Sequence, residues 1–294
     1  MLSDRAMRQL RRASVAARRL PGAVLLLDVV RRAFGRRKRT VTVGDFDGAL
    51  RMRLCLHEHM QSQTFWFGYY SRDIILLFDR LLHPGMVVFD IGANVGEIAL
   101  AAARRVGPHG RVYAFEPVPH LYQSLEEHVA INRLRQVVPV AQGLLNEETE
   151  CTIFEAPARL GDGMVNTGLA TIYGDKIRSR ALGRVPMTTL DSYCRRMRIS
   201  RIDVVKIDVE GAELAVLQGG METIGRLRPY IVVEVQAETA KRAGYEPGEL
   251  MSFVISLDYE LFGIGRKGKL VPLTNAAKES FSNVLCVPHD ASVP

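Results

Sequence analysis

The feature that most constrains the fold is a series of short apolar segments that alternate with helical patterns. The segments are residues 86–91, 111–115, 137–142, 202–208 and 230–236. Strands that are apolar on both faces form parallel sheets with helices packed on both sides. Helical spacing of apolar residues joins them at residues 97–106, 120–132 and 212–219. We therefore expect an α/β fold built on a parallel sheet with helices on both faces.

Two further features precede and complete this sheet. Residues 40–56 alternate between apolar and polar side chains around Asp47-Gly48, which is typical of a β-hairpin. Segments 259–264 and 282–287 follow each other without a full crossover helix, so we expect an antiparallel pair at the edge of the same sheet. The hairpin marks the start of an α/β domain that we assign to residues 40–294.

The composition is that of a globular protein in a reducing compartment. The chain has 294 residues, of which 47% are hydrophobic and 24% are charged, so it can bury a large core. Its four cysteines have no C-x-x-C spacing, so neither a disulfide framework nor a cysteine zinc site is indicated. No stretch reaches the roughly 18 uncharged apolar residues of a membrane span. We expect a cytoplasmic protein that is soluble or peripheral at a membrane.

The positive charge of the chain is concentrated at its N-terminus. The first forty residues hold twelve Lys and Arg against two acids, and the rest carries a net charge of −3. Apolar spacing predicts a basic amphipathic helix over residues 4–20, with Arg8, Arg11 and Arg12 on its other faces, and a second short helix after it. We interpret residues 1–39 as a solvated arm or a helical cap. Contact with an anionic membrane or substrate, contact with nucleic acid, and an organellar targeting peptide are the alternatives.

A glycine turn between a strand and a helix is the strongest chemical signal in the chain. The strand at 86–91 runs into Asp90-Ile-Gly92-Ala-Asn94-Val-Gly96, and the next strand ends at Glu116, 24 residues after Gly92. An acid at about this distance from such a turn is the arrangement that binds a ribose. The turn lacks the second glycine that a pyrophosphate needs, and the flanking Asp90 and Glu97 would repel it. Two carboxylates suit a ligand that carries a sulfonium and an ammonium group, such as S-adenosylmethionine.

Several motifs together resemble the FkbM family of S-adenosylmethionine-dependent methyltransferases. They are the glycine turn, Glu116-Pro117, Thr189-Leu-Asp191, the run Val205-Lys-Ile-Asp-Val-Glu-Gly-Ala-Glu213 with Leu217, and Ser282-Asn-Val-Leu285. The resemblance covers residues from about 40 to 288. It implies a class I methyltransferase sheet, with seven strands of which the last is antiparallel, and methyl transfer to oxygen in many members. It also implies that the methionine part of the cofactor is lined by Asp90, Gly92, Asn94 and Gly96 and that the ribose is held by Glu116.

The carboxyl ends of the central strands supply candidate groups for the methyl acceptor. Asp208 ends a central strand beside the glycine turn, Glu210 follows at once, and Glu234 ends the neighbouring strand. These carboxylates could provide a general base, a divalent cation site or both, although their spacing does not indicate a cation. Asp208 could instead cap the next helix, and Glu213 could serve only the dipole of that helix.

The sequence therefore predicts a methyltransferase that acts on a hydroxyl of a sugar, glycolipid or secondary metabolite. A glycine-rich insertion at about 151–186 is interpreted as a mobile lid over the acceptor. A nucleic-acid methyltransferase is disfavoured, because base-amine enzymes usually carry Pro-Pro-aromatic residues where this chain has Val209-Glu210-Gly211. A non-catalytic cofactor-binding scaffold and a nucleotide-dependent oxidoreductase are the alternatives from other classes.

Overall fold

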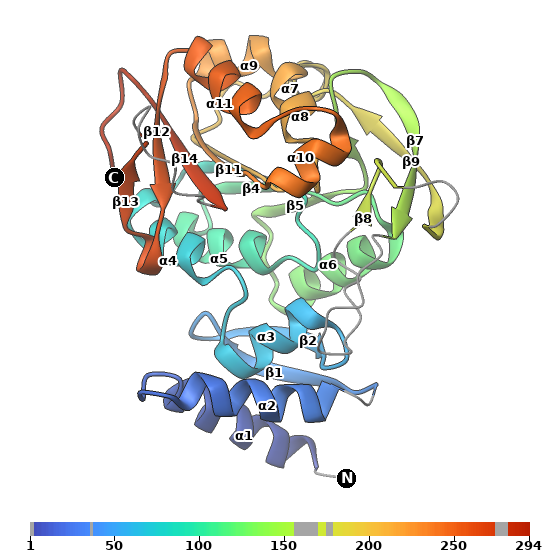
Figure 1. The fold of residues 1–294 in the computed structure, drawn as a ribbon, viewed down its shortest axis with the longest axis vertical. Coiled ribbons are helices and arrows are strands. Elements are labelled where there is room, and N and C mark those ends of the chain that lie inside the picture. The colour runs from blue at the N-terminus through green and yellow to red at the C-terminus, as the bar shows by residue number, and fades with distance from the viewer. Residues whose placement is uncertain (1–2, 36–37, 156–169, 175–178, 274–281) are drawn as a thin grey trace.

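An eight-stranded mixed sheet forms the centre of the protein (Figure 1). The computed structural model describes residues 3–35, 38–155, 170–174, 179–273 and 282–294. The order across the sheet is β13-β12-β14-β11-β10-β3-β4-β5. The strands are β3 (Val87–Ile91), β4 (Arg111–Phe115), β5 (Val137–Val140), β10 (Val204–Ile207), β11 (Tyr230–Glu234), β12 (Tyr259–Ile264), β13 (Leu270–Pro272) and β14 (Asn283–Pro288).

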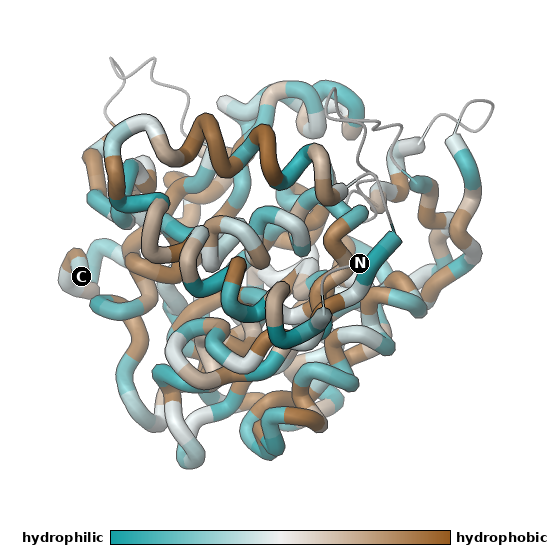
Figure 2. The backbone as a smooth tube through the Cα atoms, turned by 90° about the horizontal axis from the view of Figure 1, so that it is seen from below, coloured by the Kyte–Doolittle hydropathy of each residue, from teal (hydrophilic) through white to brown (hydrophobic). Residues whose placement is uncertain are grey.

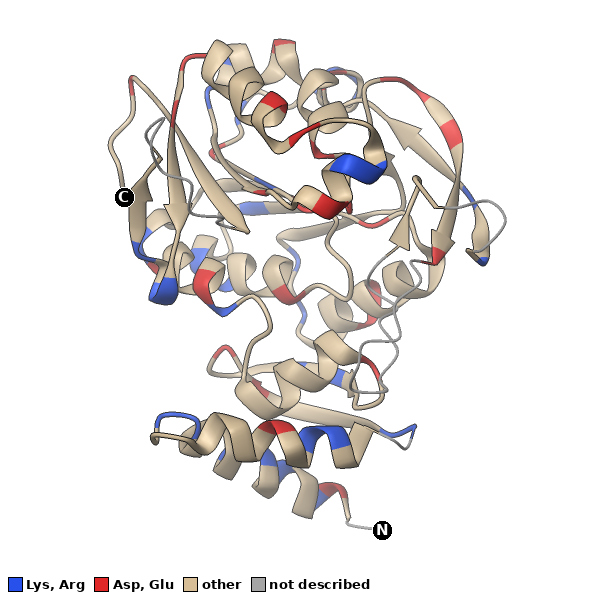
Figure 3. Cartoon of the chain, viewed as in Figure 1, with Lys and Arg blue, Asp and Glu red and all other residues tan. Residues whose placement is uncertain are grey.

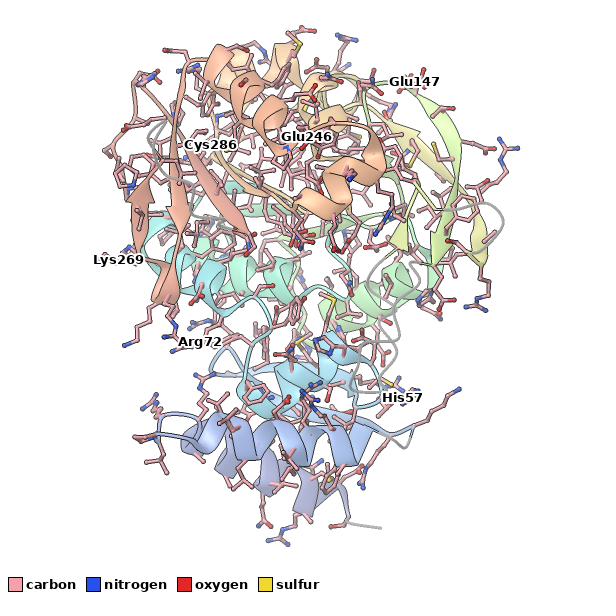
Figure 4. All side chains as sticks on the ribbon, viewed as in Figure 1. His57, Arg72, Glu147, Glu246, Lys269 and Cys286 are labelled. Carbon is pink, nitrogen blue, oxygen red and sulfur yellow. The ribbon has the colours of Figure 1, made fainter. Side chains whose placement is uncertain are left out.

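The strand order confirms the class I methyltransferase fold. Strands β5, β4, β3, β10 and β11 are parallel, and the last strand, β14, is antiparallel to both β11 and β12. The predicted closing pair is therefore antiparallel, with β14 inserted between β11 and β12. The short β13 adds an edge strand beyond the seven expected. Strand β14 can occupy a position between two other strands because its side chains are buried on both faces of the sheet. The side chain of Cys286, for example, is fully buried (Figure 4).

Helices cover both faces of the sheet, as the apolar strands predict. One face carries α4 (Arg72–Leu81), α5 (Glu97–Val106) and α6 (Pro119–Ile131), and the other carries α7 (Leu190–Met197), α8 (Glu213–Gln218), α9 (Met221–Leu227), α10 (Ala237–Ala243) and α11 (Pro247–Ser256) (Figure 1). Successive residues of β3 enter opposite layers: Val88 packs in the core under α5, and Phe89 packs in the core on the other face. This double burial explains why the strand is apolar without alternation.

The register of the parallel strands brings the predicted site residues to one edge. Ile207 of β10 pairs with Ile91 of β3 on one side and with Val233 of β11 on the other. The residues that follow these three positions are therefore level with one another. Gly92, Asp208 and Glu234 meet there because parallel strands end together at the same edge of a sheet.

The insertion contains a second sheet rather than only a loop. Strands β6 (Gly143–Leu144), β7 (Thr149–Glu155), β8 (Ala170–Thr171) and β9 (Ala181–Thr188) form it in the order β6-β9-β7-β8. The glycine-rich sequence of the insertion did not indicate these strands, whose apolar face in β7 and β9 is formed by the buried Ile153, Val185 and Met187. Residues 156–169 and 175–178 lie outside the described part of the chain. Movement of this insertion stays a prediction.

The N-terminal residues form a helical cap on a β-hairpin. The elements are α1 (Asp4–Ala17), α2 (Ala23–Gly35), the hairpin strands β1 (Thr40–Phe46) and β2 (Leu50–Cys55), and α3 (His59–Phe67). The hairpin is confirmed, with antiparallel pairing from Thr40 to Cys55. Phe34 packs edge-on against the buried Trp66 at 5.3 Å between ring centroids, and His57 Nδ1 donates to the carbonyl of Gly35 at 2.6 Å (Figure 4). These contacts favour the cap over the solvated arm.

One arginine of α1 is buried rather than exposed. The expectation that Arg11 takes a solvent-facing side of the helix is wrong, since it is 2% exposed and lies on the same face as the buried Met7 and Ser14. Its Nε contacts Asp45 Oδ1 at 2.6 Å, and its Nη1 donates to the carbonyls of Thr64 and Phe65. Burial is tolerated because the charge is paired and its hydrogens are used.

Other expectations can be compared with the described residues. All four cysteines are free, in agreement with the absence of a disulfide framework. Among these residues, none of the helices combines the length and apolar character needed to cross a membrane.

We predict that Arg11→Ala destabilises the protein by about 1 to 3 kcal/mol, because it leaves the partly exposed Asp45 without its ion-pair partner and the Phe65 carbonyl without this donor, while the Thr64 carbonyl keeps the backbone N–H of Gly68. Urea unfolding followed by circular dichroism measures the change. The matched control is Arg12→Ala on the exposed side of the same helix, which should change the free energy of unfolding by no more than about 0.5 kcal/mol. Equal effects of the two substitutions would contradict the anchoring role of Arg11.

Candidate active site

The glycine turn after β3 is held against the end of β10. Gly92 has φ 81°, Asn94 has φ 52° and Gly96 has φ 95°, values that favour glycine or asparagine. A Cβ atom on Gly92 would lie 1.8 Å from the carbonyl oxygen of Asp208. Only a residue without a side chain allows the backbone to come this close to the Asp208 carbonyl. The glycine turn therefore packs directly against the first residue after β10.

Glu116, directly after β4, is tied to the same turn. Its Oε2 accepts a hydrogen bond from the backbone N–H of Asn94 and its Oε1 accepts one from Val118, both at 2.8 Å. The side chain is almost fully buried, and burial raises the pKa of Glu116 to about 7. The carboxyl group therefore lies at the cavity wall with lone pairs left to accept further hydrogen bonds.

Lys206 of β10 lies between Asp90, at the end of β3, and Asp208, directly after β10. Its Nζ lies 3.5 Å from Asp90 Oδ1 and 3.3 Å from Asp208 Oδ2, and it donates to the carbonyl of Gly92 at 3.2 Å. Burial would lower the pKa of Lys206, but the two aspartates outweigh burial and raise that pKa. The ammonium group therefore remains charged and binds the carboxylates on both sides.

The predicted acceptor residues come together as a cluster of three carboxyl groups. One carboxyl oxygen from each of Asp208, Glu210 and Glu234 lies within 4.8 Å of the others. Burial, followed by the charge of Asp208, raises the pKa of Glu210 to about 8 and the pKa of Glu234 to about 10. The raised pKa values favour the protonated form of these two groups beside Asp208, so the cluster offers both hydrogen-bond donors and an acceptor.

The loop that carries Glu210 is fixed by residues outside the cluster. Glu210 has φ 55°, and its carbonyl accepts from Thr171 Oγ1 in β8 at 2.9 Å. Glu213 accepts from the backbone N–H groups of Val209 and Gly211, and from the hydroxyl of Tyr245 at 3.0 Å. Glu213 thus stabilises the loop, which agrees with the structural alternative for that residue.

A single cavity joins the turn, Glu116 and the carboxyl cluster. It encloses about 1100 Å³, counting the space at its open mouth. Of the predicted cofactor residues, Gly92, Asn94 and Glu116 line it, whereas Asp90 and Gly96 lie behind the wall. Asp90 is fully buried and reaches the site through Lys206.

Residues from the N-terminal half of the chain complete the wall of the cavity. Met60 of α3 and Tyr70 line the cavity, together with Glu97. Glu97 accepts from Thr64 Oγ1 at 3.0 Å and from the backbone N–H groups of Tyr70 and Ser71. For the aromatic residues of this region, the sequence favours helix packing, with an aromatic wall for a substrate as the alternative. Trp66 is buried in the core, whereas Tyr70 lines the cavity.

The residues present fit the expected cofactor. Glu116 offers a buried carboxyl for ribose hydroxyls, and the remaining wall carries carboxylates that suit a ligand with positive charges. The three-carboxyl cluster could also hold a divalent cation, because oxygen ligands are those that Mg²⁺ and Mn²⁺ prefer.

Comparison with known proteins agrees with this geometry. Residues 90–261 match the family model for the methyltransferase FkbM domain. The hexuronic acid methyltransferase AglP of Haloferax volcanii is 28% identical, over 57% of this chain and 63% of that protein. The 2-O-methyltransferase NoeI of Sinorhizobium fredii is 25% identical, over 53% of this chain and 65% of that protein. The chain thus spans less than two thirds of the length of these relatives.

One solved structure that is similar to this chain is also a methyltransferase. The crystal structure of the methyltransferase FkbM from Methylobacillus flagellatus covers 90% of this chain and 60% of its own, with 12% sequence identity and a TM-score of 0.42.

We predict that Gly92→Ala lowers the free energy of unfolding by at least ~2 kcal/mol, because the added methyl group meets the Asp208 carbonyl at a positive φ. Gly225→Ala in α9 is the matched control, since its Cβ would meet no atom within 4 Å and alanine favours the helix by up to about 1 kcal/mol. Urea denaturation of both variants measures the difference. A Gly92→Ala protein as stable as the wild type would show that β3 and β10 do not need this contact.

Proposed function

Because the chain belongs to the methyltransferase FkbM domain family, we propose that it transfers a methyl group from S-adenosylmethionine to a hydroxyl oxygen of a sugar, glycolipid or other small molecule. The observation that carries the proposal is the contact between Gly92 and Asp208. Because of this contact the carboxylate of Asp208, which can accept a proton, lies beside the turn to which we assign cofactor binding.

The cofactor contacts follow from the wall of the cavity. Glu116 accepts hydrogen bonds from the ribose hydroxyls, and the turn at Gly92 and Asn94 borders the methionine part. Asp90 acts through Lys206, and Gly96 shapes the turn that starts α5. When bound, the cofactor supplies an activated methyl group, so the protein needs no covalent nucleophile.

Asp208 is the proposed general base. Its carboxylate is partly exposed, at 29%, and can reach an acceptor in the cavity, while Lys206 holds it in place. Glu210 and Glu234, with raised pKa values, donate hydrogen bonds that orient the acceptor. If a divalent cation binds instead, the same three carboxylates are its ligands.

The side chains that line the cavity support an acceptor that offers a hydroxyl group and carries no phosphate. Among the described residues, five carboxyl groups line the cavity, from Glu97, Glu116, Asp208, Glu210 and Glu234, against one ammonium group, from Lys206. That ammonium group is already paired with Asp90 and Asp208, so the described wall offers a phosphate backbone no free cation to bind, which disfavours a nucleic acid. The names of AglP and NoeI, a hexuronic acid methyltransferase and a 2-O-methyltransferase, support a saccharide acceptor and methylation of oxygen.

We predict that Asp208→Asn keeps cofactor binding and lowers turnover by about a hundredfold to ten-thousandfold, because asparagine cannot take the proton of the hydroxyl. Turnover is measured as transfer of labelled methyl from S-adenosylmethionine to a panel of neutral methyl glycosides, with mass analysis of the product. Binding of S-adenosylhomocysteine is measured by calorimetry. Glu238→Gln, on the exposed side of α10, is the control and should leave both unchanged.

Added EDTA separates the two roles of the carboxyl cluster. A direct base keeps its activity, whereas a cation site loses activity and recovers it with Mg²⁺ or Mn²⁺. Normal turnover of Asp208→Asn would refute the assignment of Asp208. Binding of NAD in place of S-adenosylhomocysteine, or cofactor binding without turnover on any acceptor, would support the oxidoreductase or the scaffold.

We predict that affinity for S-adenosylhomocysteine falls about tenfold between about pH 8 and about pH 6, because protonation removes the charge that accepts the ribose hydrogen bonds and the pKa of Glu116 is about 7. Calorimetry across this range measures it. Glu116→Gln keeps the size of the side chain and should bind more weakly with a shallower pH profile. The amino group of S-adenosylhomocysteine also titrates in this pH range, so the measurement compares the pH dependence of affinity in the wild type with that in Glu116→Gln. If affinity changes with pH in the same way in both proteins, the proposed role of Glu116 is contradicted.

A further inference from the structure

Exposed apolar side chains are concentrated on one helix of the N-terminal cap. Of the ten large hydrophobic residues exposed in the described part of the chain, five lie between residues 20 and 29. They are Leu20, Val24, Leu25, Leu26 and Val29, with exposed fractions of 51–78%. We refer to them as the α2 patch. A group of this kind on a water-soluble domain marks contact with an apolar surface.

The α2 patch is not needed to hold α2 on the protein. The side of the helix opposite Leu25, Leu26 and Val29 performs that role, where Arg31 and Gly35 are buried and Phe34 packs on Trp66. Helix α1 is likewise held from its inner face, by Met7 and Arg11. The two helices form the end of the molecule furthest from the central sheet (Figure 1), and a view onto that end shows a largely hydrophobic α2 (Figure 2).

Exposed arginines share this end of the molecule with the apolar side chains, and Figure 3 shows basic residues on both helices. They are Arg5, Arg8, Arg12 and Arg19 on and after α1, and Arg32 on α2. The two acids of the segment are each paired: Asp4 with Arg39 at 3.0 Å, and Asp28 with Arg31 and Arg32. The surface therefore combines apolar side chains with a strong net positive charge.

We propose that this end of the protein binds an anionic lipid surface, with the α2 patch inserted at the level of the headgroups and the arginines of α1 on the lipid phosphates. Apolar insertion together with basic residues is the combination that holds a helix in a membrane interface. The sequence pattern leaves contact with an anionic membrane as one alternative for residues 1–39. In the structure the large exposed apolar side chains of this segment lie on α2 and in the turn before it, whereas α1 buries Met7 and Arg11.

Two other partners fit the surface less well. A second copy of the chain would bring the same arginines together, and like charges repel. A nucleic acid would use the arginines but leave Leu25 and Leu26 exposed to water. An anionic bilayer satisfies both the charge and the apolar side chains.

Vesicle co-sedimentation of the full chain tests the proposal. The probes are vesicles of two parts phosphatidylcholine to one part phosphatidylglycerol, compared with vesicles of phosphatidylcholine alone. We expect binding to the anionic vesicles that weakens with salt. The double substitution Leu25→Asn with Leu26→Asn should weaken it on the order of tenfold or more, since two apolar side chains no longer leave water.

Matched variants separate the contributions. Met221→Asn with Ile255→Asn removes two exposed apolar side chains elsewhere and should leave vesicle binding unchanged. Arg8→Gln with Arg12→Gln should reduce binding to anionic vesicles and its dependence on salt. Circular dichroism and binding of S-adenosylhomocysteine confirm that each variant is folded, independently of the methylation reaction.

Three results would overturn the proposal. The first is a folded wild type that does not bind anionic vesicles. The second is an equal loss in the Met221 and Ile255 variant. The third is a dimer, seen by analytical ultracentrifugation, that the Leu25 and Leu26 substitutions convert to a monomer, because the patch would then bind a second copy. Binding of RNA that depends on Arg8 and Arg12 but not on the leucines, without vesicle binding, would assign the surface to nucleic acid.

Discussion

The close approach of Gly92 to the carbonyl of Asp208 is the contact on which the rest of the site depends. It is possible because β3 and β10 are adjacent and in register, and because residue 92 has no side chain. The turn after β3 and the residue after β10 are therefore parts of one rigid junction. Methyl transfer requires the donor and the acceptor to be aligned, and in the function that we propose this junction would set their positions through the backbone.

Charge at the junction is balanced by Lys206. A buried ammonium group between Asp90 and Asp208 neutralises part of the negative charge of the cavity, which would otherwise destabilise the fold. The remaining charge is reduced by protons on Glu210 and Glu234, whose pKa values are raised. The cluster is therefore compatible with folding in the absence of a metal, and a cation would have to displace these protons to bind.

Much of the fold and part of the site could be predicted from local patterns. The bounds of α5 and β4 agree with the predicted 97–106 and 111–115, since both elements are buried and their periodicity is clear. Glu116 and Asp208 were found because each follows a strand whose end lies at the edge where parallel sheets bind ligands. Strands β7 and β9 were missed because their apolar face is completed only by pairing across a long insertion.

The remaining differences come from tertiary contacts that no local pattern encodes. Asp90 lies behind the wall of the cavity because Lys206 occupies the space in front of it, and nothing in the motif distinguishes the two positions. Arg11 is buried because Asp45 and two carbonyls lie opposite it. Helical spacing alone assigned it to solvent, since arginine is rarely buried unless it is paired.

The buried arginine also explains why the cap and the site form one structure. Arg11 of α1 donates to the carbonyl of Thr64, the hydroxyl of Thr64 donates to Glu97, and Glu97 accepts from the backbone of Tyr70. Glu97 and Tyr70 line the cavity. The N-terminal helices are thus connected to the cavity wall by three consecutive hydrogen bonds. The first comes from the buried guanidinium group of Arg11, and hydrogen bonds of charged groups are stronger than those between neutral groups. A surface that orients α1 and α2 therefore also orients the mouth of the cavity relative to that surface.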